Sequence, residues 1–402
     1  MDIRPQAVAP CEPEVQRSNE DFSLVVGGPL YQLFLRTRLA RPPLERVRRR
    51  MLALVAITWL PPALLSALTG RFVSGHVPFL LDLTNLQFVT TLPLLIGAEV
   101  LVHRRLGHLV PEFVGRDLVA AEDRSRFDDL VARAMHLRNS LGAELAILLL
   151  AFTGGYWFWR TYASLHVATW YVVPVDGSMR LTGAGYWLAF VSLPISRFIL
   201  FRWYFRLFIW SAFLWRVSRL RLRLNPLHAD RAGGLGFLED SAPTFAPVLV
   251  AQSTYLATVL GDQIWHQGAR LSDFRYEVVA FVALLMLFVL LPLTFFVVRL
   301  REAQLRGTRR YGRLATRYTN SFEEKWFAAN GSQSEPLLGT SDIQSLADLA
   351  NSYEVVRAMR LVPFGKTMAL RLAIVIALPL VPLIFTIVRV DDVLAALVKL
   401  VV

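Results

Sequence analysis

Apolar and polar stretches alternate along the chain, and seven of the apolar stretches are long enough to cross a membrane. A helix needs about 20 mostly apolar residues to span the hydrocarbon core of a bilayer. The predicted spans cover residues 51–69, 84–102, 141–159, 184–208, 244–265, 276–298 and 367–388. The pattern therefore predicts an all-α integral membrane protein with about seven transmembrane helices and cytoplasmic helical extensions.

Polar segments divide the chain into parts. The predicted parts are an N-terminal segment (1–50), a six-span bundle (51–298) with cytoplasmic connections at 103–140 and 209–243, a cytoplasmic helical region (299–366) and a last span with an outer tail (367–402). The first 20 residues are polar and contain several prolines, so we expect them to be disordered. Residues 391–402 are too short to cross and predict an amphipathic helix at the outer interface.

A proline pair, Pro61-Pro62, falls inside the first predicted span. Proline removes a backbone donor and leaves the carbonyl four residues earlier without its helical partner. Membrane helices tolerate such a kink when neighbouring groups bond the freed carbonyls. We therefore expect the span to continue through the pair, with neighbours supplying those bonds.

Basic residues lie mainly on one predicted side of the membrane. If the N-terminus is cytoplasmic, 32 of the 43 lysines and arginines fall in the N-terminal segment and the inner connections. Cytoplasmic connections of membrane proteins carry such an excess. We therefore predict a multi-pass protein with its N-terminus in the cytoplasm and its C-terminus outside. Its basic inner face is expected to meet anionic lipid headgroups.

The composition excludes several classes of protein. Charged residues make up only 18% of the 402 residues and hydrophobic residues 54%, which leaves too few charges for the surface of a soluble fold of this size. The net charge of +12 does not indicate nucleic acid as a partner, because the arginines lie beside the apolar spans. Cys11 is the only cysteine, so an intrachain disulfide is excluded.

The sharpest local motif is a glycine-rich segment, residues 225–237, in the connection between the fourth and fifth spans. Its candidate residues for an inner ligand site or gate are His228, Asp230, Arg231, Gly233, Gly234 and Gly236. A glycine-rich turn can aim several backbone N–H groups at an anion. A structural interpretation stands beside this one, in which the segment is a tight turn whose polar residues cap helices. A hydrolytic or metal role for His228 and Asp230 is the third alternative.

A polar stripe runs along the fifth predicted span. Thr254, Thr258, Asp262 and His266 follow each other at intervals of four residues, which places them on one helix face. Polar residues in a span usually face the bundle interior or a water-filled cavity. The stripe is therefore a candidate pore or cavity lining, with hydrogen bonding between packed helices as the alternative. Two possible ligands are too few for a closed metal site.

Several charges fall at similar depth near the inner ends of the spans. The candidates for buried charges are Glu99, Glu144, Arg197 and Arg371. We expect Glu99 or Glu144 to pair with Arg197 or Arg371, or else to line an ion or proton path. Arg202 and Arg206 are predicted to extend to the headgroups instead, as long basic side chains can.

The last polar region predicts two helices. Residues 301–327 form a basic helix able to lie along anionic lipid. Ser341 or Asp342 is a plausible N-cap for a second helix. Its apolar positions, Ile343, Leu346, Leu349 and Ala350, recur at intervals of three and four and indicate one packed face. We expect that face to pack on the bundle or on a neighbouring subunit.

Two segments resemble a known family. Asp-Arg-Ala-Gly-Gly-Leu-Gly-Phe at 230–237 and Asp-Ile-Gln-Ser-Leu-Ala-Asp-Leu at 342–349, in this order along the chain, are similar to segments in a family of uncharacterised bacterial multi-span membrane proteins. The resemblance implies a bacterial inner-membrane location. It implies no activity, so no functional residue is carried over from it.

The function favoured by these features is a pore or transporter for an ion or small solute, which we expect to be a homo-oligomer. The polar stripe, the charges near the spans and the glycine-rich segment as an inner gate support this hypothesis. A membrane sensor or partner-binding component is the first alternative. A membrane enzyme that acts on a lipid or polyprenyl substrate is the second. The sequence identifies no catalytic residue, metal ligand or cofactor.

Overall fold

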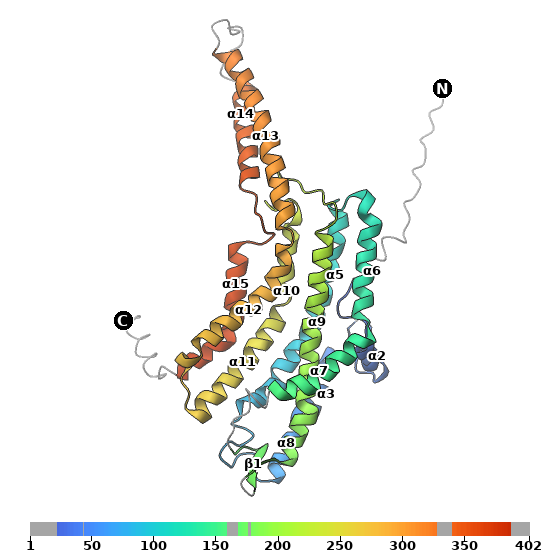
Figure 1. The fold of residues 1–402 in the computed structure, drawn as a ribbon, viewed down its shortest axis with the longest axis vertical. Coiled ribbons are helices and arrows are strands. Elements are labelled where there is room, and N and C mark those ends of the chain that lie inside the picture. Colours follow the sequence, from blue (N-terminus) through green and yellow to red (C-terminus); the bar gives the residue numbers. More distant parts are fainter. Residues whose placement is uncertain (1–21, 43, 159–167, 176–177, 328–339, 387–402) are drawn as a thin grey trace, which may run out of the picture.

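The computed structural model describes residues 22–42, 44–158, 168–175, 178–327 and 340–386. The predicted N-terminal disorder and the amphipathic tail at 391–402 lie outside these residues. Within them the chain is built almost entirely of helices (Figure 1). The predicted all-α class is therefore confirmed.

The helices are α2 (Pro29–Arg36), α3 (Val47–Leu68), α4 (Leu86–Val89), α5 (Thr91–Gly115), α6 (Arg124–Arg138), α7 (Leu141–Phe158), α8 (Gly183–Trp187), α9 (Leu193–Val217), α10 (Ser241–Thr244), α11 (Ala246–Gln267), α12 (Arg275–Thr294), α13 (Val297–Trp326), α14 (Ser341–Arg357) and α15 (Lys366–Ala377). Shorter helical turns are Leu83–Asn85, Ala121–Asp123, Leu188–Ser192, Leu235–Asp240, Leu271–Phe274 and Leu378–Thr386. Strands β1 (Val172–Val175) and β2 (Ser178–Leu181) form an antiparallel pair.

Six helical segments of the described chain are long and apolar enough to cross a membrane: Val47–Leu68, Leu83–Gly115, Gly183–Val217, Leu235–Gln267, Leu271–Thr294 and Lys366–Phe385. They match six of the seven predicted spans. The remaining predicted span, 141–159, corresponds to α7. It reaches a spanning length only when it is counted together with α6, from which it bends by 44°. The structure thus supports a multi-pass membrane protein with six spans, or seven if this bent pair crosses.

Helix α3 continues through its proline pair because other helices bond the two freed carbonyls. Pro61 leaves the carbonyl of Ile57 without its helical donor, and the indole Nε1 of Trp187 donates to that oxygen at 3.0 Å. Pro62 does the same to Thr58, whose carbonyl accepts a bond from Ser192 Oγ at 2.6 Å. Trp187 is the last residue of α8, and Ser192 is the last residue of the helical turn between α8 and α9. The expected compensation is confirmed, and it ties α3 to this part of the bundle.

Helix α9 lies at the centre of the bundle, with α5, α6, α7 and α12 packed around it (Figure 1). The main apolar core forms where these helices meet, and Trp203 of α9 and Phe113 of α5 are completely buried there. Helices α11 and α12 diverge from α9 toward the end of the bundle that carries β1 and β2 (Figure 1).

Helices α13 and α14 form a hairpin that projects from the opposite end of the bundle (Figure 1). Gln304 anchors its base, because its side-chain amide donates to the carbonyls of Arg357 and Met359, each at 3.1 Å. Near the tip, Lys325 Nζ lies 2.9 Å from the carboxylate of Asp342. The hairpin is therefore fixed at both ends by polar contacts.

The expected N-cap of the second helix in this region is wrong. Helix α14 has Thr340 at its N-cap position, and the carboxylate of Asp342 accepts bonds from Lys325 and Trp326 of α13 instead of capping. Ile343 is 48% exposed. The helix packs on α13 of its own chain, so its apolar positions are shared between this contact and the surface.

Candidate functional site

The glycine-rich segment folds around its own aspartate. The carboxylate of Asp230 accepts backbone N–H bonds from Ala232 at 2.8 Å, Gly234 at 3.2 Å and Gly236 at 2.7 Å. Gly234 has a φ of 99°, which favours glycine, and a Cβ at Gly236 would lie 2.8 Å from Asp230. The N–H groups that the sequence offered to a ligand anion are thus bonded to a side chain of the segment itself.

Further contacts tie this segment to the chain beyond α14. The guanidinium of Arg360 donates to the carbonyl of Asp230 at 3.0 Å and to Glu239 at 3.2 Å. His228 Nδ1 lies 2.9 Å from the Asp230 carboxylate. Burial acts to raise the pKa of Asp230, but the three N–H bonds together with His228 outweigh burial, so this pKa lies below its usual value. These contacts favour a structural role for Asp230, and the side chain of Arg231 is exposed.

Of the four residues in the polar stripe of α11, only Asp262 and His266 have side chains close to each other. The hydroxyls of Thr254 and Thr258 donate to carbonyls of their own helix, those of Val250 and Tyr255. Asp262 is 1% exposed. His266 Nδ1 lies 3.5 Å from its carboxylate. None of the four lines the cavity around Arg197 that is described below.

Asp262 instead anchors the turn that precedes α4. Its two carboxylate oxygens accept the backbone N–H groups of Leu83 and Thr84, each at 2.8 Å. Asp82 caps the same turn by accepting from Thr84 at 2.9 Å, and it also accepts the indole N–H of Trp170 at 2.7 Å. A carboxylate at a helix N-terminus satisfies donors that would otherwise be unpaired. Asp262 therefore links α11 to the turn that leads into α4.

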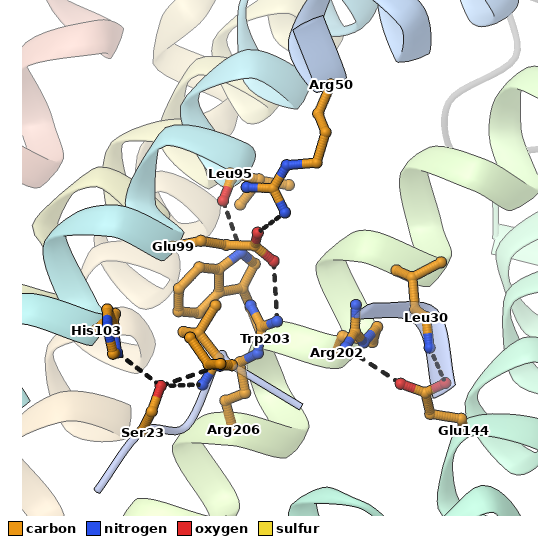
Figure 2. Close-up of polar contacts among 12 residues, drawn as sticks. Ser23, Leu30, Arg50, Leu95, Glu99, His103, Glu144, Arg202, Trp203 and Arg206 are labelled. Carbon is orange, nitrogen blue, oxygen red and sulfur yellow. Dashed lines mark hydrogen bonds and ion pairs between the residues drawn. The ribbon is translucent and has the colours of Figure 1, made fainter. Parts of the chain in front are cut away.

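Two of the predicted inner charges, Glu99 and Glu144, belong to a buried network of ion pairs (Figure 2). Glu99 of α5 lies between two arginines, 2.8 Å from Arg50 of α3 and 2.9 Å from Arg206 of α9. On α7, Glu144 lies 3.1 Å from Arg202 of α9, and its other oxygen accepts the N–H of Leu30 at 2.9 Å. All five charged side chains in these pairs are at most 11% exposed. The network joins four helices to the start of α2.

The expectation that Arg202 and Arg206 extend to the headgroups is wrong. Carboxylates on α5 and α7 face α9 at the same depth, so both arginines find a partner inside the protein and need no contact with the headgroups. The sequence analysis did not identify Arg50 as a buried charge. Arg50 directly precedes the first apolar stretch, where a basic residue normally indicates the cytoplasmic side of a span. Helix α3 begins at Val47, which places Arg50 one turn inside the helix, where it is 1% exposed.

The expected partners of Arg197 and Arg371 are also wrong. Arg371 is exposed on α15. Arg197 is 5% exposed, yet among the described residues no carboxylate lies within 4 Å of it. Its Nη2 donates to the hydroxyl of Tyr255 at 2.5 Å, its guanidinium lies 4.3 Å from the centre of that ring, and its Nε is buried without a partner. The carboxylates of α5 and α7 face the other side of α9.

Arg197 lies in the wall of a cavity of about 500 Å³. The cavity is bounded by α4, α5, α7, α9, α11 and α12. Its polar lining residues are Gln87, Thr91, Ser196, Arg197, Tyr204, Gln252 and Tyr255. The hydroxyl of Tyr204 donates to Gln252 across the gap between α9 and α11. Tyr255 was missed because it lies beside the threonine stripe, one residue from Thr254, and an isolated tyrosine carries no pattern.

Comparison with protein-family models, curated proteins and solved structures finds no match for this chain. The resemblance based on residues 230–237 and 342–349 therefore stays a prediction. The cavity around Arg197 is the site whose geometry bears most directly on function.

Replacing Glu99 with Gln is expected to destabilise the protein strongly. The change leaves Arg50 and Arg206 buried without a counter-charge, and breaking a buried ion pair in this way costs about 3–5 kcal/mol. The free energy of unfolding in mixed detergent micelles, followed by circular dichroism, measures the effect. Glu112→Gln is the matched control, since Glu112 pairs with Arg116 at the surface, where such a pair contributes less than about 1 kcal/mol. Equal effects of the two changes would contradict the structural role of the network.

Replacing Asp230 with Asn is expected to remove an acid-sensitive contribution to stability. The pKa of Asp230 is below 3.8 in the folded protein. Its carboxylate therefore stabilises the fold fully above that value, and the contribution is lost as the pH falls through the folded pKa. The wild type should unfold at a higher temperature than Asp230→Asn at about pH 6, and this difference in unfolding temperature should shrink as the pH falls below about 4.

Asp240→Asn is the control for this experiment, because Asp240 is exposed nearby and makes no cap bond through its side chain. If the difference in unfolding temperature between wild type and Asp230→Asn does not change with pH, the charge of the carboxylate is not what stabilises the glycine-rich segment.

Proposed function

We propose that this protein is a membrane carrier that binds an anionic solute in the cavity between α9 and α11. One observation carries the proposal: Arg197 is buried in the cavity wall with a neutral tyrosine as its polar partner. An ionisable residue inside a membrane bundle is expensive to bury and usually marks a solute or ion pathway. A bound anion would supply the counter-charge.

The cavity supports a transport site better than the stripe of α11 does. Both oxygens of Asp262 are bonded to backbone N–H groups, so little of this carboxylate is left for a permeating ion. The cavity instead gathers a cation, two tyrosines and a glutamine from α9 and α11. Ligand-binding pockets are typically lined by apolar side chains, with a few polar groups that converge on the ligand.

We also propose that the protein resides in a bacterial inner membrane as a homo-oligomer, with its N-terminus in the cytoplasm and its C-terminus outside. The excess of arginine in the N-terminal segment and inner connections supports this orientation. The basic residues near the inner span ends would then meet anionic headgroups.

A membrane sensor or partner-binding component is the second candidate function. The observation that favours it is the hairpin of α13 and α14, which projects from the bundle (Figure 1). Arg309, Arg310, Arg313 and Arg317 line a basic hollow along α13. A projecting hairpin with a basic face is suited to contact an acidic surface.

Single-cysteine labelling tests the orientation. In a Cys11→Ser background, cysteine replaces Arg180 on β2 or Arg313 on α13, and both positions are exposed. A membrane-impermeant maleimide should label Arg180→Cys in intact bacterial cells, and Arg313→Cys only after the membrane is permeabilised. The opposite labelling would overturn the proposed orientation.

Anion-concentration jumps on proteoliposomes test transport. Chloride, acetate and octanesulfonate are applied in turn while the current on a solid-supported membrane is recorded. At least one anion should give a protein-dependent current, and Arg197→Gln should reduce it about tenfold or more, because a charged hydrogen bond contributes about 1.5–3 kcal/mol.

Arg371→Gln is the matched control, since it removes an exposed charge from a spanning segment and should leave the current unchanged. Equal currents in wild type and Arg197→Gln would remove the cavity from the transport path. An absence of current with every anion would favour the second candidate function.

A further inference from the structure

Arg197 differs from the other buried arginines of the bundle. Arg50 and Arg206 share Glu99, and Arg202 pairs with Glu144, whereas no carboxylate of the described chain lies within 4 Å of Arg197. Its exposed fraction is 5%, similar to theirs. Burying a charge without a counter-charge costs several kcal/mol. The Nε of Arg197 is buried without a partner, as are Nε and Nη2 of Arg50. Arg50 has Glu99 as its counter-charge, whereas the described chain offers Arg197 none, so this arginine is left with a donor and a charge for an external acceptor.

The remainder of the cavity wall is mainly apolar. Its apolar lining residues are Leu92, Leu95, Leu150, Trp157, Leu200, Phe201 and Phe281. A volume of about 500 Å³ is far more than a bare inorganic anion requires and lies within the range of about 300–1,000 Å³ of small-molecule pockets. A hydrated ion would leave most of this wall in contact with water. The cavity therefore favours a ligand with a charged end and an apolar body.

The cavity reaches the outer surface of the bundle at α7. Leu150 and Trp157 both line it, and they are 51% and 60% exposed. Both lie on a helix whose exposed residues are mostly apolar, as is expected of a face that meets acyl chains. A ligand dissolved in the membrane can therefore reach the cavity from the side.

We infer that the cavity binds a single-chain amphipathic anion, whose carboxylate or similar acidic head contacts Arg197 and whose alkyl chain lies along the apolar wall toward α7. Tyr255 holds the guanidinium by a hydrogen bond and by its ring, which leaves Nε for the head group. Ser196 directly precedes the arginine in the lining, and its hydroxyl can supply a further polar contact. The inference deepens the proposed transport function by naming its solute class, and it rests on that function only in treating the ligand as cargo.

Quenching of Trp157 fluorescence by 11-bromoundecanoate tests the inference in the full-length protein in phosphatidylcholine nanodiscs. The difference in quenching between the wild type and Trp157→Phe isolates the signal of this tryptophan from that of the other nine. We expect this difference to saturate with 11-bromoundecanoate concentration. Undecanesulfonate, which remains anionic at all working pH values, should displace the bound 11-bromoundecanoate and restore the fluorescence. Arg197→Gln should weaken the affinity about 10- to 100-fold, as expected for the loss of a charged hydrogen bond. Arg371→Gln should leave it unchanged.

Several outcomes would overturn the assignment. One is equal, non-saturable quenching by 11-bromoundecanoate and by uncharged 11-bromoundecanol. Another is wild-type affinity in a folded Arg197→Gln protein. Displacement by phosphatidylglycerol as strongly as by undecanesulfonate would assign the site to a two-chain bilayer lipid and overturn the single-chain ligand. Arg197→Lys, which keeps the charge and the packing of the stem, should retain part of the binding and so guards against misfolding as the cause.

The proposed ligand and the proposed carrier function can be contradicted separately. Saturable, Arg197-dependent binding without any protein-dependent current would support the ligand and contradict the carrier function. Arg197-dependent currents of chloride or acetate without amphiphile binding would support the carrier function and contradict the amphipathic ligand.

Discussion

The ion pair of Glu99 with Arg50 and Arg206 is the contact on which the arrangement of the bundle depends. Its members come from α5, α3 and α9, and all three are buried. In a medium of low dielectric constant an unpaired charge is so costly that the three helices can pack only with these groups together. The second pair, Arg202 with Glu144, adds α7 and places the N–H of Leu30 on the same carboxylate. Helix α9 is thereby fixed against its neighbours on one side.

The opposite side of α9 faces the cavity. Arg197 and Tyr204 are seven residues apart, about two helical turns, whereas Arg206 follows Arg197 by nine residues, about two and a half turns. One face of the helix therefore carries arginines neutralised by carboxylates, and the other carries an arginine bonded to Tyr255. The arginines of one face have a structural role, and the arginine of the other face is the one that we propose to meet a ligand. The difference lies in what α5, α7 and α11 present to it.

The spans could be predicted because hydrophobic length is a local property of the sequence. The continuation of α3 through Pro61 could be predicted for the same reason, although its partner Trp187 could not. Charge pairing depends on residues far apart in the chain: Glu99 and Arg206 are separated by 107 positions. An arginine near the end of a span is expected to contact the headgroups when its spatial neighbours are unknown. For Arg206 this expectation was wrong. The alternatives left open for the glycine-rich segment included the turn that Asp230 organises, but only the fold shows which N–H groups it uses.

The two sides of α9 also differ in how they resist movement. Moving α9 away from α5 and α7 separates buried ion pairs, and each broken pair costs about 3–5 kcal/mol. Among the described residues, α9 contacts the polar groups of α11 through hydrogen bonds to Tyr255 and Gln252, both neutral. Such bonds contribute about 0.5–3 kcal/mol each. A change in the cavity on binding of the proposed ligand would therefore cost less if α11 and α12 moved against a fixed α9. The ion-paired half of the bundle then acts as the rigid wall that holds Arg197 in position.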